Sequence, residues 1–229
     1  MAAFFKMKVW RLLLVLAISS STSFSQRSSI AIGSWNLKDF GQSKSAGELK
    51  FIAKTIKDYD VAAIQEVVAG FGGSQAVARL ANELNQTGSK WDYTVSEPTF
   101  GDSYKTERYA FLWKTARIKK NGKAWLEQKY KVEIDREPYY ATFSMGSRTF
   151  TLVNFHAITK SKQPETEIKY FKFLPESYPD LNLIFCGDFN LPQSHTVFNP
   201  LRKMGYAPAL QQQKTSLKLE CKNDVCLSS

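Results

Sequence analysis

The segment Leu183-Ile184-Phe185-Cys186-Gly187-Asp188-Phe189-Asn190 runs from apolar residues directly into a carboxylate and an amide. A short apolar run of this kind is typical of a buried strand. Three more apolar stretches also end in polar side chains: Ser34-Trp35-Asn36, Ala63-Ile64-Gln65-Glu66 and Leu152-Val153-Asn154-Phe155-His156. We therefore expect five polar residues to meet at one rim of a sandwich of sheets, namely Asn36, Glu66, His156, Asp188 and Asn190.

The first part of the chain predicts strands that alternate with helices. A strand over residues 30–36 is followed by apolar residues at the spacing of one buried helical face, namely Leu49, Ile52, Ala53 and Ile56. A strand over residues 60–67 comes next. Phe71-Gly72-Gly73 then breaks the chain, and Ser74 is the expected N-cap of a helix that buries Val77, Leu80, Ala81 and Leu84. This order predicts an α/β layered fold.

The rest of the chain predicts mainly short strands, over residues 93–96, 109–113, 125–132, 139–143 and 149–156. Asn121-Gly122 and Met145-Gly146-Ser147 favour hairpin turns between them. A helix over residues 165–174 is expected to lead into the strand over residues 181–186.

The N-terminus predicts a secretory signal peptide over residues 1–25, cleaved after Ser25. Lys6, Lys8 and Arg11 precede a short apolar run, which is followed by a serine-rich exit. A core helix is the alternative, but the basic start favours export. The run is too short for a membrane span, which needs about 20 residues. We expect one domain over residues 26–229, secreted or periplasmic, without stable membrane insertion.

The chain is basic, with a formal net charge of +10. A cationic surface suits a polyanion such as nucleic acid, or an anionic membrane surface. Solubility alone is the other explanation of the charge. Of the three cysteines, Cys186 is expected to be a buried free thiol, whereas Cys221 and Cys226 could close a small disulfide loop. A zinc site is less well supported, because a second pair of ligands is missing.

Phosphodiester cleavage needs a cation, a positioned water and a group that exchanges protons near neutral pH. Glu66 is a suitable hard ligand for magnesium or calcium, and Asn36, Asp188 or Asn190 could complete the shell or hold the phosphate. His156 is the natural acid–base group. Taken singly, each residue has an ordinary alternative, such as a solvated carboxylate, a turn-capping asparagine or a structural histidine.

In this order and at these spacings, three motifs resemble the endonuclease/exonuclease/phosphatase superfamily and its deoxyribonuclease I branch. They are Trp35-Asn36-Leu37-Lys38-Asp39-Phe40-Gly41, Ile64-Gln65-Glu66-Val67 and Gly187-Asp188-Phe189-Asn190. The resemblance covers nearly all of residues 29–200. It implies a four-layer α/β sandwich, with two face-packed, mainly antiparallel sheets flanked by helices. It also implies an exported, monomeric endonuclease that hydrolyses phosphodiester bonds in nucleic acid, DNA being favoured, with Mg²⁺ or alternatively Ca²⁺ or Mn²⁺.

Two further stretches resemble the deoxyribonuclease branch in particular. In Ser103-Tyr104-Lys105-Thr106-Glu107, Tyr104 takes the place of a groove-contacting tyrosine and Glu107 that of the glutamate that orients a catalytic histidine, here His156. The spacing between the two is one residue longer than usual. Arg136 resembles a phosphate-contacting arginine, and a solvated surface charge is the alternative.

The chain also departs from the family pattern. Val68 stands where the nuclease branch carries a groove-entering arginine. A Tyr-Asp strand start and a Ser-Asp-His motif near the C-terminus are missing, and His195 follows Asp188 too closely to replace the second histidine. We therefore expect the natural protein to continue past Ser229, with further strands, and this 229-residue chain to be incomplete as an enzyme.

Two other functions remain open at this point. A phosphoesterase of the same superfamily that acts on a phospholipid or an inositol phosphate would use the same central residues, but would give Tyr104 and Arg136 no role. A catalytically inactive polyanion-binding protein would keep the fold, but has no evident need of Glu66, His156 and Asp188 together.

Overall fold

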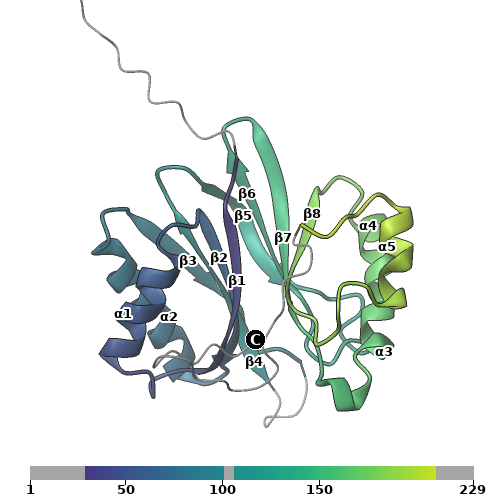
Figure 1. Ribbon diagram of the computed structural model, residues 1–229, viewed down its shortest axis with the longest axis horizontal. Coiled ribbons are helices and arrows are strands. Elements are labelled where there is room, and N and C mark those ends of the chain that lie inside the picture. The colour runs from purple at the N-terminus through teal and green to yellow at the C-terminus, as the bar shows by residue number, and fades with distance from the viewer. Residues whose placement is uncertain (1–28, 101–105, 210–229) are drawn as a thin grey trace, which may run out of the picture.

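The computed structural model describes residues 29–100 and 106–209. These residues form four layers, in which two sheets face each other and helices cover both outer faces (Figure 1). Helices α1 and α2 flank one sheet, and α3, α4 and α5 flank the other. The predicted four-layer α/β sandwich is confirmed.

The first sheet has the strand order β1-β2-β4-β3. Its strands are β1 (Ile32–Phe40), β2 (Val61–Val68), β3 (Trp91–Val95) and β4 (Glu107–Lys114). Strands β1 and β2 run parallel because helix α1 (Ala46–Ile56) crosses over between them, while β4 pairs antiparallel with both β2 and β3. Helix α2 (Phe71–Asn85) joins β2 to β3.

The second sheet has the order β5-β6-β7-β8. Its strands are β5 (Lys119–Leu126), β6 (Tyr139–Met145), β7 (Arg148–His156) and β8 (Leu183–Asp188). Only β7 and β8 run parallel in this sheet. The helices that cover it are short, and they are interspersed with 3₁₀ turns: η1 (Lys160–Lys162), α3 (Glu165–Ile168), η2 (Lys169–Phe173), α4 (Leu174–Ser177), η3 (Thr196–Phe198) and α5 (Asn199–Lys203).

Helix α1 forms where the apolar spacing predicts it. Ser45 is its N-cap, and Ser45 and Glu48 make a reciprocal capping box that satisfies two free backbone N–H groups. All four residues predicted to face the core are buried: Leu49, Ile52, Ala53 and Ile56.

The predicted start of helix α2 is wrong. The helix begins at Phe71, with Gly70 as its N-cap, rather than after Ser74. Gly73 lies inside the helix. Only a glycine fits there, because a Cβ atom would come within 1.9 Å of the carbonyl oxygen of Val68. The glycine therefore permits a close approach between α2 and the end of β2, and does not break the chain.

Two other elements differ strongly from the predictions, whereas the ends of the remaining strands shift by only a few residues. Strand β5 covers residues 119–126 and not 125–132, and Gly122 lies within it at φ +61, where the register with β6 shifts. A glycine at positive φ thus serves an irregularity of the strand rather than a turn between strands. The helix predicted over residues 165–174 is divided into α3, η2 and α4.

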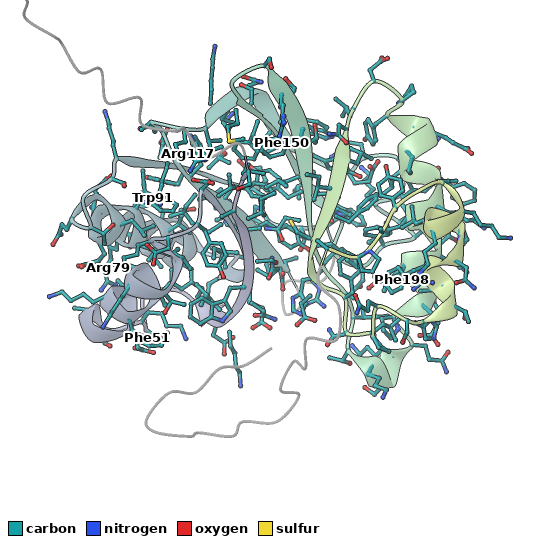
Figure 2. All side chains as sticks on the ribbon, turned by 45° about the horizontal axis from the view of Figure 1, so that its top comes forward. Phe51, Arg79, Trp91, Arg117, Phe150 and Phe198 are labelled. Atoms are coloured by element: carbon teal, nitrogen blue, oxygen red, sulfur yellow. The ribbon has the colours of Figure 1, made fainter. Side chains whose placement is uncertain are left out.

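Apolar side chains fill all three spaces between the four layers. Figure 2 shows Phe51 on the side of α1 and Phe198 on the opposite side, near α5. Cys186 on β8 is a half-buried free thiol, and desolvation raises its pKa to about 12. It is less buried than expected because β8 is an edge strand of the described sheet.

Several predictions concern residues outside the described ranges. These are the signal peptide over residues 1–25, Tyr104, and the Cys221–Cys226 pair. Among residues 29–100 and 106–209, no helix has the length and apolar character that a membrane crossing requires.

Candidate active site

Four of the predicted residues come together where β1, β2, β7 and β8 meet: Asn36, Glu66, His156 and Asp188. The Asn36 side-chain amide donates to Glu66 Oε1 over 2.8 Å and to Asp188 Oδ2 over 3.3 Å. His156 Nε2 lies 3.4 Å from the same amide nitrogen. Asn36 therefore connects a carboxylate from each sheet with the imidazole.

Irregular backbone geometry turns Glu66 toward this group. Glu66 has φ +58, which is unusual for a residue with a side chain, and the pairing of β2 with β4 shifts register between Ile64 and Val67. Such an irregularity re-aims side chains next to active sites. Strain of this kind persists only where the surrounding structure enforces it, and it concentrates at functional sites.

The neighbouring Gln65 points the other way, into the space between the sheets. Its amide donates to Asn154 Oδ1 on β7 over 2.5 Å, and Asn154 in turn donates to the carbonyl oxygen of Ile64 over 3.0 Å. Gln65 is 1% exposed and Asn154 is fully buried. This pair links the two sheets directly behind the site and was not foreseen from the sequence.

His156 and Glu107 form a buried pair, as expected. His156 Nδ1 lies 2.8 Å and 3.1 Å from the two carboxylate oxygens of Glu107. The two residues are only 6% and 7% exposed. The carboxylate favours the tautomer with its proton on Nδ1. Nε2 faces the site, 3.8 Å from Glu66 Oε1.

Arg136 packs onto the same carboxylate. Its Nη1 lies 3.1 Å from Glu107 Oε2, and its Nη2 donates to the carbonyl oxygen of Ala157. The side chain is 15% exposed, so it is not a solvated surface charge. Its buried Nε has no partner among the described residues.

Tyr109 is a site residue that the sequence analysis missed. Its hydroxyl accepts from the backbone N–H of His156 over 3.2 Å and donates to the carbonyl oxygen of Arg136 over 3.3 Å. Burial and then the nearby Glu107 carboxylate raise the pKa of Tyr109 well above its usual value, so the hydroxyl stays neutral and keeps both bonds. Its place two residues after Glu107, on the same face of β4, is the only signal that the sequence contains.

Asp188 and His156 are paired across β8 and β7. The preceding Gly187 lets the strands approach, because a Cβ atom there would lie 1.9 Å from the carbonyl oxygen of Phe155. Asn190 lies beside the group, with its backbone N–H on Asp188 Oδ1 at 3.0 Å and its side-chain amide on the carbonyl oxygen of Ala157 at 2.9 Å.

The oxygen atoms around Asn36 suit a hard divalent cation. In the described part of the chain, no three His, Cys, Asp or Glu side chains form a complete metal cage. Magnesium, however, is commonly held by one or two carboxylates together with waters and substrate phosphate. Glu66 and Asp188 both converge on Asn36, whose buried Oδ1 receives no hydrogen bond from any described residue. These residues therefore fit the predicted metal.

Two other predicted positions lie apart from this group. Val68 ends β2 and is 40% exposed. His195 caps the 3₁₀ turn η3, where its Nδ1 accepts from the backbone N–H of Val197 over 3.2 Å. As expected, His195 lies at the start of a helical turn.

Comparisons with known proteins agree with the motifs and with the fold. The model of the "Endonuclease/Exonuclease/phosphatase family" matches residues 33–223. The chain is 27% identical over 199 residues to a deoxyribonuclease of Thioalkalivibrio sp. (strain K90mix), covering 82% of this chain and 53% of that protein. It is 31% identical over 153 residues to deoxyribonuclease-1 of Canis lupus familiaris, covering 64% and 46%. The chain thus spans about half the length of these two relatives.

Solved structures share the fold. An endonuclease/exonuclease/phosphatase family protein from Bacteroides thetaiotaomicron superposes with a TM-score of 0.56 at 17% identity, covering 77% of this chain and 69% of that one. The human Nocturnin catalytic domain superposes with a TM-score of 0.52 at 17% identity, covering 74% and 68%.

Proposed function

Because the chain belongs to the endonuclease/exonuclease/phosphatase family, we propose a metal-dependent nuclease that hydrolyses phosphodiester bonds in nucleic acid, with DNA as the favoured substrate. The observation that carries the proposal is the buried His156–Glu107 pair, whose outer nitrogen faces the Asn36, Glu66 and Asp188 cluster.

Glu66 is the proposed metal-holding residue, with Asn36 and Asp188 as further ligands. Mg²⁺, or alternatively Ca²⁺ or Mn²⁺, would neutralise charge on the phosphate when bound there. His156 exchanges a proton through Nε2, since Glu107 fixes the other ring nitrogen. Asp188 and Asn190 orient the attacking water and the phosphate.

The proposed substrate rests on charge and on the relatives. The formal net charge is +10, and without the three basic residues of the proposed signal peptide it is still +7. Such a charge favours a polyanion, and the relatives described above are named deoxyribonucleases. Tyr104 and Arg136 are the proposed contacts to nucleic acid. The Arg136 guanidinium is already paired with Glu107 and is 15% exposed, and it would add positive charge next to the phosphate. Export as a monomer and a Cys221–Cys226 disulfide complete the proposal.

A plasmid-nicking assay on the complete natural protein tests the function. We expect supercoiled plasmid to be nicked with Mg²⁺ and to remain intact with EDTA. The His156→Ala variant should lose at least about 100-fold in rate, because general acid–base catalysis contributes about 10²- to 10⁴-fold. Turnover of a phosphodiester lipid without plasmid nicking would instead identify a phosphoesterase of another specificity. Plasmid binding that persists in EDTA without nicking would identify a binding protein.

A further inference from the structure

Glu167, on α3, is a buried carboxylate outside the group around Asn36. It is 3% exposed. Its Oε1 accepts from the backbone N–H of Ile158 over 2.7 Å, and its Oε2 accepts from the backbone N–H of Asp135 over 3.0 Å. One side chain therefore joins two loop segments that are far apart in the sequence.

Both segments carry parts of the candidate active site. Asp135 immediately precedes Arg136, which pairs with Glu107. Ile158 lies two residues beyond His156 and directly after Ala157.

Ala157 is the point where these contacts converge. Its carbonyl oxygen accepts from Arg136 Nη2 and from the Asn190 side-chain amide, the latter over 2.9 Å. Its backbone N–H donates to the carbonyl oxygen of Asp188 over 2.8 Å. A shift of the segment after β7 would therefore disturb Arg136, Asn190 and Asp188 together.

We propose that Glu167 is a positioning residue of the active site. By holding the Asp135 and Ile158 backbones at a fixed separation, its carboxylate sets the place of Arg136 and, through Arg136 and Glu107, the orientation of the His156 imidazole. The effect on turnover rests on the proposed nuclease function. The effect on the geometry of His156 does not.

A role confined to stability is the competing explanation. The partly buried backbone N–H groups of Asp135 and Ile158 need acceptors, and the Glu167 carboxylate supplies them. Burial raises the pKa of Glu167 above its usual value, because desolvation disfavours the ionised form. Stability alone predicts that the loss of the carboxylate weakens the fold but leaves the folded enzyme at full activity.

Glu127 provides a matched control. It follows β5 directly, is fully buried, and accepts from the backbone N–H of Lys129 over 2.8 Å and from the Tyr140 hydroxyl over 2.9 Å. No described hydrogen bond links it to His156, Glu107 or Arg136. The variants Glu167→Gln and Glu127→Gln thus each replace a buried carboxylate by an amide of the same length, and only one of them touches the segments that hold the site.

The first measurement compares kcat and KM of the complete natural protein and both variants, at a temperature where all three are folded by circular dichroism. We expect Glu167→Gln to lower kcat about 10- to 100-fold, since a small misplacement of catalytic groups costs this much. KM is expected to rise as well, because Arg136 is also a proposed contact to nucleic acid, so the comparison rests on kcat. Glu127→Gln should keep the wild-type kcat. Equal kcat values for the folded wild type and the folded Glu167→Gln variant would overturn the proposal.

The second measurement observes His156 directly and needs no activity. The 229 residues contain two histidines, so that ¹⁵N-histidine labelling gives few imidazole signals. We expect a protonated Nδ1 signal for His156 that shifts or broadens in Glu167→Gln and is unchanged in Glu127→Gln. His195 serves as the internal reference, because its Nδ1 accepts from a backbone N–H. If the wild type cleaves no nucleic acid, the proposed function fails, whereas an unchanged His156 signal in Glu167→Gln refutes the positioning role.

Discussion

His156 Nδ1 lies 2.8 Å from Glu107 Oε2, and the same oxygen lies 3.1 Å from Arg136 Nη1. The imidazole is therefore one end of a buried chain that runs from arginine through carboxylate to histidine. Two of its members come from different sheets, because Glu107 begins β4 and His156 ends β7.

Replacing Glu107 by Gln should lower kcat by about 10- to 100-fold while the protein remains folded. The amide keeps the shape of the side chain but removes the charge that both Arg136 and His156 face, and proton transfer by a positioned histidine contributes about 10²- to 10⁴-fold. Initial rates on plasmid DNA measure the effect. The combined variant Glu107→Gln/His156→Ala should be no slower than His156→Ala alone, and additive losses would show that the two residues act separately.

Magnesium should raise the melting temperature of the protein in the absence of nucleic acid, and Glu66→Gln should abolish this increase. A ligand at about 100 times its Kd stabilises the folded state by about 2.7 kcal/mol. Glu133→Gln changes an exposed carboxylate elsewhere and should keep the full shift. A magnesium response that survives in Glu66→Gln would place the metal at other residues.

Gly187→Ala should destabilise the protein by about 4 kcal/mol or prevent folding, which places it among the most severe single substitutions. Its φ is +134, and the new methyl group would meet the carbonyl oxygen of Phe155. Gly88→Ala is the control, because Gly88 has φ +92 with open space around it. In Gly88→Ala the only cost is the strained backbone conformation, and we expect the free energy of unfolding to fall by about 1 kcal/mol. Urea unfolding measures both, and equal losses would mean that the contact with Phe155 relaxes freely.

The pH dependence of stability should report the buried carboxylate of Glu137, which is 4% exposed and accepts from the backbone N–H of Phe100. Burial raises its pKa above 4.5, although the Phe100 N–H and Lys131 partly oppose the shift. A carboxyl group whose pKa is raised by folding stabilises the protein fully below its unfolded pKa. This contribution is lost as the pH rises through the folded pKa.

The free energy of unfolding of Glu137→Gln should therefore lack that decline between pH 4.5 and the raised pKa. Glu48 is the control of opposite sign, because hydrogen bonds from Ser45 lower its pKa. Its contribution is present above pH 4.5 and is lost as the pH falls through the lowered pKa. Identical pH profiles for Glu137→Gln and the wild type would show that Glu137 does not titrate as described.

A double-mutant cycle on Gln65→Ala and Asn154→Ala should show a coupling of about 0.5 to 3 kcal/mol, since the two buried amides bond each other. Asn154→Ala combined with Gln75→Ala should be additive, because Gln75 bonds Gln42 and shares no partner with Asn154. Additivity in the first cycle would show that the link between the sheets contributes nothing to stability.

Asn36, Glu66, His156 and Asp188 were predictable from the sequence because each stands where an apolar strand becomes polar, and that change is visible in the order of residues. Tyr109 and the Gln65–Asn154 link were not. A sequence states the type of a residue but not its partner 47 or 89 positions away. The early start of α2 was missed for a related reason. Gly73 is a glycine because it lies against the backbone of Val68, and this contact exists only in the folded chain.

The link between Gln65 and Asn154 joins two sheets that are synthesised one after the other. Residues up to Lys114 build one sheet, with Asn36, Glu66 and Glu107, whereas His156 and Asp188 belong to the sheet made afterwards. The earlier sheet thus holds carboxylates without an imidazole, and neither sheet alone contains all the residues of the candidate site. These residues would come together only when the later sheet docks onto the earlier one.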